Sequence, residues 1–347
     1  MKRGMVAMAA ALVMASGMPA LAQEGGAKPA QPAKAREVAP GVKVERIADL
    51  QVGDKAPELK IAEWVKGDPV TSFEKGRVYV VEFWATWCGP CIAGMPHLSE
   101  LQKEYKDKGV RIIGVNIWDD TTKVAPFMSD KGGDEKMHYT VAIEEKIPDT
   151  DARRTGRMAK EWMEASKQQG IPSAFIVDQK GFIAWIGHPM TMDEPLKEIV
   201  AGEWDIAAAA RKYVDEMKTE VKFSEYMTAI RAGDTAKAYA AAKELIAGPT
   251  WDNAQMLNSL AWFIVDPDAK IEPRDAELGL KIAERASELT KHENAMILDT
   301  YAWALWFAGQ HDRALEVQEK AVSLAPANMK EQLAEALERM KKMKSGG

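Results

Sequence analysis

Cysteine is scarce in this sequence, because Cys88 and Cys91 are the only two among 347 residues. A framework of several disulfides is therefore excluded. A structural zinc site needs four ligands, and none of the five histidines lies at metal-ligand spacing from this pair. A disulfide across two intervening residues also encloses too little chain to restrict the unfolded state much. We interpret the pair as a redox-active dithiol, with a structural disulfide or a metal site as the alternatives.

A basic charge balance and long hydrophobic runs are also missing. The formal net charge is −6, which gives no reason to expect nucleic-acid binding. After residue 22, no stretch approaches the ~18 uninterrupted apolar residues that a transmembrane helix needs. The hydrophobic share of 46% and the charged share of 28% are typical of globular proteins. The length predicts two or three domains.

Residues 1–22 have the pattern of an export signal. Lys2 and Arg3 precede an apolar core from Met5 to Met18, and a small-residue cleavage site ends at Ala22. We therefore predict cleavage after Ala22 and a location in the periplasm or outside the cell. An uncleaved anchor is the alternative.

Four segments follow from composition and periodicity: the signal peptide, a flexible linker over 23–45 rich in Ala, Pro, Gly and Lys, an α/β domain over 46–205, and an α-helical domain over 206–347. Strands and helices alternate in the α/β domain, which predicts a parallel sheet core. The expected strands are 59–64 and 70–73 (as a hairpin), 78–84, 110–118, 139–143, 174–178 and 182–186. The expected helices are 90–106, one from 122, 158–169 and 192–201.

The dithiol is placed where a strand ends and a helix begins. Val78–Trp84 is apolar and β-branched, and Cys88 follows it at the expected helix start. Unpaired N–H groups and the helix dipole favour a thiolate at Cys88. Cys91, one turn further in and expected to be more buried, could attack a mixed disulfide formed at Cys88. Pro90 suits the first turn, because its missing N–H would have no partner there.

Two motifs carry a resemblance to a known family. Glu82 to Cys91 reads EFWATWCGPC, with Pro96 five residues after Cys91, and Gly170 to Phe175 reads GIPSAF. In this order the motifs resemble the thioredoxin superfamily, and within it the exported TlpA/ResA-like thiol–disulfide oxidoreductases related to the cytochrome c maturation reductases. The resemblance covers about Ile47 to Trp204 and implies a thioredoxin-like fold, a central mixed sheet flanked by helices.

The resemblance also implies roles for individual residues. Pro172 would form a cis peptide bond facing the dithiol, and Ile171 before it would pair with a substrate segment. Glu82 would be a buried carboxyl that relays the proton of Cys91, and an outward-facing glutamate is the alternative. Trp84 is expected to be plain core. Substrate would also contact three residues around the first cysteine: Trp87, Gly89 and Pro90.

The family implies protein thiol or disulfide substrates and a redox partner, for which a membrane electron donor is one candidate. No cofactor beyond the Cys88–Cys91 disulfide is expected. The Gly-Pro pair between the cysteines is that of reducing thioredoxins, so we predict a reductase. A dithiol oxidase or isomerase is the alternative, because potentials across the fold span ~150 mV.

An internal repeat appears in the helical domain. Leu257–Trp262 matches Leu298–Trp303, and a weaker third copy spans about 223–247. The later copy resembles a tetratricopeptide repeat, with small residues or turn residues at Ala302, Gly309, Ala314, Ala321 and Pro326. The helical domain would then bind a protein or peptide. The alternatives are a stabilising or dimerising cap, or a docking scaffold to which the redox chemistry is subordinate.

Overall fold

The computed structural model describes residues 36–148 and 156–346. The predicted signal peptide, its cleavage site and most of the predicted linker lie outside these residues. The end of that linker differs from the expectation, because Ala39 is buried and its N–H donates to the carbonyl oxygen of Gly53. Among the described residues, no helix has the length and apolar character to cross a bilayer.

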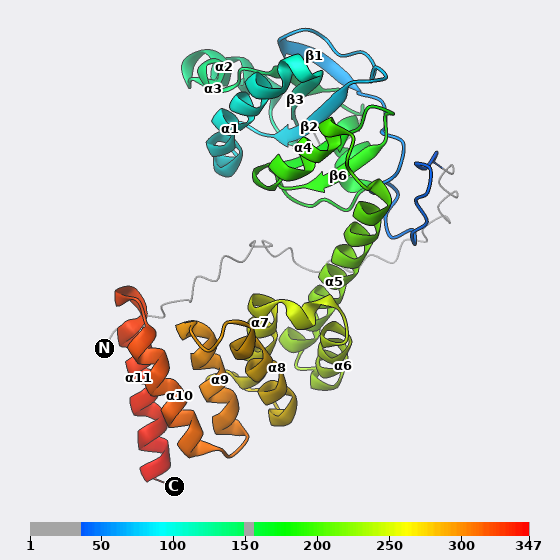
Figure 1. The fold of residues 1–347 in the computed structure, drawn as a ribbon. Coiled ribbons are helices and arrows are strands. Elements are labelled where there is room, and N and C mark those ends of the chain that lie inside the picture. The colour runs from blue at the N-terminus through cyan, green and yellow to red at the C-terminus, as the bar shows by residue number, and fades with distance from the viewer. Residues whose placement is uncertain (1–35, 149–155, 347) are drawn as a thin grey trace. The chain divides into compact units, whose positions relative to one another are not determined.

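A six-stranded mixed sheet organises the α/β domain (Figure 1). Its spatial order is β1-β4-β3-β2-β5-β6. β2, β3 and β4 are parallel, whereas β1, β5 and β6 run antiparallel to the strands beside them. The predicted mixed sheet is thus confirmed. The strands are β1 (Ile61–Lys66), β2 (Val78–Trp84), β3 (Val110–Asn116), β4 (Thr140–Glu144), β5 (Ser173–Val177) and β6 (Ile183–Gly187).

β2 is buried along its whole length. Because side chains alternate across a strand, Val80 and Trp84 enter one hydrophobic core, and Val81 and Phe83 enter the core on the opposite face. Glu82 therefore shares the face of Val80 and Trp84. That face is covered by α1 (Gly89–Tyr105), α2 (Val124–Asp130) and α4 (Asp193–Ala201), and the short α3 (Gly133–Lys136) follows α2.

The predicted amino-terminal hairpin is wrong. β1 pairs antiparallel with β4, and residues 70–73 form no strand. Pro69 lacks the N–H that a strand pairing would use, so this segment is held by its side chains instead. Val70 is buried, and the Phe73 ring lies 5.0 Å from that of Tyr79 on the sheet face opposite α1.

The segment predicted as helix 158–169 is helical, but it winds as a π-helix over Ala159–Glu164. It covers the sheet face opposite α1 together with the first turns of α5 (Ile206–Ala232). Trp162 is fully buried there and makes edge-to-face contact with Phe175 at a centroid distance of 5.4 Å. The segment between β4 and β5 therefore supplies a large part of this core.

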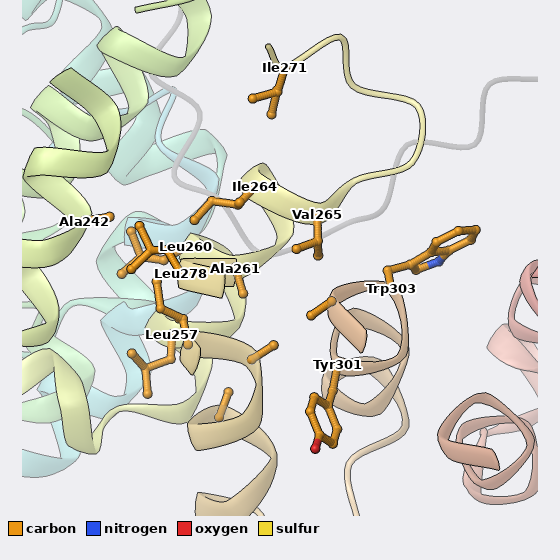
Figure 2. Close-up of a cluster of buried hydrophobic side chains, with 14 of the residues drawn as sticks. Ala242, Leu257, Leu260, Ala261, Ile264, Val265, Ile271, Leu278, Tyr301 and Trp303 are labelled. Atoms are coloured by element: carbon orange, nitrogen blue, oxygen red, sulfur yellow. The ribbon is translucent and has the colours of Figure 1, made fainter. Parts of the chain in front are cut away.

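The carboxyl-terminal region is helical, as predicted. α5 packs on α6, α7 on α8 and α9 on α10, and these pairs correspond to the three predicted repeat copies. Figure 2 shows their shared core, in which Leu257, Leu260 and Ile264 of α7 face Leu278 of α8. The helices are α6 (Thr235–Ile246), α7 (Ala254–Val265), α8 (Ala276–Leu289), α9 (Ala295–Phe307), α10 (His311–Leu324) and α11 (Ala327–Ser345).

The earlier repeat copy differs from the later one at two places, Gly279 and the segment after α7, and both differences have structural explanations. Gly279 stands where the later copy has an alanine, and a Cβ there would lie 2.6 Å from Cγ1 of Val265. The extra residues after α7 bring Arg274 back to the end of that helix, where its guanidinium donates to the carbonyl oxygens of Ile264 and Asp266. The arginine therefore satisfies carbonyl groups that a helix end leaves unpaired.

We predict that Trp162→Ala lowers the free energy of unfolding by about 3–5 kcal/mol, because it removes a fully buried aromatic side chain and leaves a cavity. Urea unfolding followed by circular dichroism measures the change. Trp87→Ala is the matched control and should cost less than about 1 kcal/mol, since the Trp87 side chain is 60% exposed. Equal losses in the two variants would contradict the prediction.

Candidate active site

Cys88 and Cys91 form a disulfide at the amino-terminal end of α1. Cys88 is the N-cap residue, and its Sγ accepts a hydrogen bond from the N–H of Cys91 at 3.2 Å. Pro90 lies in the first turn, as predicted. The same N–H and the positive end of the helix dipole would stabilise a thiolate at Cys88 after reduction.

The two cysteines are equally covered, which differs from the expectation that Cys91 is the more buried. Cys88 is 3% exposed and Cys91 is 2% exposed. The loop before β5 accounts for the cover on Cys88, because the carbonyl oxygen of Ile171 lies 3.8 Å from its Sγ. Gly89 and Pro90 are exposed beside the disulfide, so the solvent-facing side of the site is at the first turn of α1.

The peptide bond between Ile171 and Pro172 is cis, as predicted. β5 begins directly after it and runs antiparallel to β2, with Ser173 opposite Phe83. The amino-terminal end of β5 and the carboxyl-terminal end of β2 therefore lie at the same edge of the sheet. This topology brings the cis-proline loop to the dithiol.

Asp119 is a site residue that the sequence reasoning missed. Its buried carboxylate accepts hydrogen bonds from the Thr86 N–H at 2.6 Å and from the Asn116 side chain at 3.1 Å. The indole N–H of Trp87 donates to the carbonyl oxygen of Trp118 at 3.2 Å. The loop after β3 thus holds the two residues before Cys88. The signal was available, because the carboxyl ends of the parallel strands β2 and β3 meet at one edge.

Met190 was also missed. It is 51% exposed, and its sulfur would lie 3.7 Å from a Cβ on Gly94, one turn along α1 from Cys91. With the exposed Trp87, it adds a second large apolar side chain to the surface around the first turns of α1. No sequence motif marks this position.

Glu82 is buried on the α1 side of the sheet, 2% exposed, in the face that also contains Cys88 and Cys91. Its Oε2 has no hydrogen-bond partner among the described residues. Burial in this apolar surrounding raises the pKa of Glu82 from 4.5 to about 8. The carboxyl is therefore largely protonated at neutral pH.

Nothing in the described part of the chain suggests a metal centre, because no group of three or more His, Cys, Asp or Glu side chains is placed to hold an ion there. Of the predicted substrate-contacting residues, Trp87, Gly89, Pro90 and Ile171 all lie around the disulfide.

The raised pKa of Glu82 makes stability depend on pH. The folded protein binds this proton more tightly than the unfolded chain. The resulting contribution to the free energy of unfolding is therefore complete below pH 4.5 and is lost as the pH rises to about 8. We predict that Glu82→Gln gains stability relative to the wild type across this window, by at most roughly 5 kcal/mol. Urea unfolding of the oxidised proteins at several pH values measures the difference. A difference that does not change with pH would contradict this assignment.

Comparisons with known proteins agree with the geometry. Residues 51–197 match the Redoxin family model, a match that ends before α5. Protein FixW of Rhizobium leguminosarum is 29% identical over 168 residues, 47% of this chain and 72% of FixW. The thiol-disulfide oxidoreductase ResA of Oceanobacillus iheyensis is 37% identical over 106 residues, 26% of this chain and 55% of ResA. ResA of Geobacillus kaustophilus is 26% identical over 137 residues, 40% of this chain and 69% of that protein.

The chain thus spans between 55% and 72% of the length of these relatives. The match covers the sheet, the dithiol and the cis-proline loop, and leaves the helical region outside. Over residues 51–197 the chain therefore matches the Redoxin family, and its similarity to thiol-disulfide oxidoreductases supports a redox enzyme that acts on disulfides.

Proposed function

We propose that this protein is an exported reductase of protein disulfides that works through a mixed disulfide at Cys88. The position of Cys88 as the N-cap of α1 carries the proposal, because the Cys91 N–H donates to its sulfur beside the cis-proline loop. Export rests on the sequence pattern of residues 1–22. The direction of electron flow rests on the Gly-Pro pair between the cysteines.

In the first step, the Cys88 thiolate attacks one sulfur of a substrate disulfide. A bond forms between Cys88 Sγ and that sulfur, and the other substrate sulfur leaves as a thiolate that takes a proton from solvent. The backbone of Ile171 and the ring of Pro172 would hold the substrate segment. Trp87, Gly89 and Pro90 would contact it from the α1 side.

In the second step, Cys91 resolves the mixed disulfide. Its thiol gives a proton to the ionised Glu82 carboxyl, and the resulting thiolate attacks Cys88 Sγ. The Cys88–Cys91 disulfide forms, and the second substrate sulfur leaves. The substrate has gained two electrons and the enzyme has lost two, so a redox partner must return them. A membrane electron donor would fit an exported enzyme.

Cys91→Ser should trap the covalent intermediate, because Cys88 can still attack but nothing resolves the product. We predict that the reduced variant incubated with insulin accumulates a mixed disulfide, seen as a mass increase that dithiothreitol reverses. Cys88→Ser is the matched control and should form none, since Cys88, and not Cys91, is the N-cap residue whose sulfur accepts a hydrogen bond from a helix N–H. Equal trapping by the two variants would overturn the assignment of the attacking cysteine.

The reduction potential of the dithiol tests the direction. A reductase should equilibrate near the thioredoxin value of about −270 mV, whereas a strong oxidant lies near about −120 mV. Tryptophan fluorescence in dithiol buffers measures it, because Trp87 lies beside Cys88. A value near that of the oxidants would recast the protein as an oxidase or isomerase.

We further propose that the helical region is a tetratricopeptide-like domain that binds a protein or peptide. Its three antiparallel helix pairs and the small buried residues Ala302, Ala314 and Ala321 support this assignment. Cys88→Ser separates this role from catalysis. If docking is the main activity, the variant keeps its bound partner and its function. If the chain is primarily an oxidoreductase, it loses function while binding is retained.

A further inference from the structure

Three buried polar atoms without hydrogen-bond partners among the described residues converge on Gly114. They are Glu82 Oε2, Trp84 Nε1 and the hydroxyl of Tyr139. Gly114 of β3 lies opposite Glu82 in the sheet register. A Cβ on Gly114 would lie 2.9 Å from Cε2 of Tyr139 and 3.4 Å from Trp84 Nε1. The absence of a side chain at this position therefore lets an indole N–H and a phenol approach the buried carboxyl.

The chemistry of these groups is complementary. Trp84 Nε1 can only donate a hydrogen bond, and the Tyr139 hydroxyl can donate or accept. An ionised carboxylate only accepts. A protonated Glu82 carboxyl can donate one hydrogen bond. An ionised Glu82 carboxylate needs hydrogen-bond donors, and the Trp84 indole N–H and the Tyr139 hydroxyl are the donors beside it. A buried polar group without a hydrogen-bond partner costs free energy. Hydrogen bonds among these three groups would remove that cost for each of them.

The other ionisable groups around this core lie elsewhere or have partners of their own. Cys88 and Cys91 lie on α1, and Asp119 at the end of β3 is held by the Thr86 N–H. Tyr105 lies at the far end of α1. Burial, together with the Glu82 charge, raises the pKa of the Tyr139 hydroxyl, which keeps this group a donor throughout the physiological range.

We propose that Tyr139 is a positioning residue for the redox reaction: with Trp84, it donates to the ionised Glu82 carboxylate, directly or through one buried water, and so holds it ready to accept the proton of Cys91. This inference deepens the proposed function and rests on the relay role of Glu82. A hydrogen bond to a charged group that only the ionised state uses lowers the pKa of that group. Without the donor, the burial of Glu82 would leave still less carboxylate at neutral pH.

The test is Tyr139→Phe, which removes the hydroxyl and keeps the ring. We expect the pKa of Glu82, measured by carbon-13 NMR of the carboxyl in the oxidised full chain, to rise by about one unit, a tenfold change in its acid dissociation constant. Tyr105→Phe is the matched control, because it removes a hydroxyl from the same core at the other end of α1, and it should leave the titration unchanged. An unchanged Glu82 pKa in Tyr139→Phe would overturn the proposal.

Kinetic measurements distinguish the proposed positioning role of Tyr139 from the proton-relay role of Glu82. The rate at which Cys91 resolves a mixed disulfide with insulin should show a pH profile displaced upward by about one unit in Tyr139→Phe. In a Glu82→Gln background, Tyr139→Phe should have no effect on that profile, since the carboxyl that it serves is gone. An effect that persists there would show a merely structural role for Tyr139. If Glu82→Gln alone leaves the pH profile unchanged, the proposed relay role of Glu82 is wrong. The NMR titration would still test whether Tyr139 and Trp84 donate to the Glu82 carboxylate.

Discussion

The burial of β2 on both faces is the constraint on which the rest of this structure depends. A strand that is covered on both sides cannot shift its register without moving every side chain into the wrong core. Its carboxyl end is therefore a rigid point, and Cys88 follows it directly. The parallel neighbour β3 brings Asp119 to the same edge, and the antiparallel neighbour β5 brings Pro172. Three loops that are distant in sequence meet at the dithiol for this topological reason.

The same burial accounts for the chemistry of Glu82. A carboxyl on a fully covered strand loses its hydration, and the described residues provide no ion pair in exchange. Glu82 is a locally unfavourable residue on a fully buried strand, and such an unfavourable residue is typical of a functional site. The result is a buried carboxyl whose pKa is about 8, held on the same face of the sheet as the two sulfur atoms.

The helical region follows a different packing rule. Its helices approach closely because small residues lie at the contacts, as Gly279 does against Val265 and as Ala302 does within α9. Its contacts are mostly between helices that are neighbours in the sequence, so each pair forms locally. Cys88, Cys91 and Glu82 all belong to the sheet domain.

The sequence by itself determined the dithiol, the strand before it, the helix after it and the order of the other main elements, because these depend on local periodicity and on residues with strong conformational preferences. It also identified Pro172, since a motif marks it. The partner of β1, the face toward which Glu82 points and the places of Asp119, Met190 and Tyr139 around the site were decided only by the tertiary structure. Strand pairing and burial depend on contacts between distant segments, and no local pattern records which side chain will lie beside a buried carboxyl.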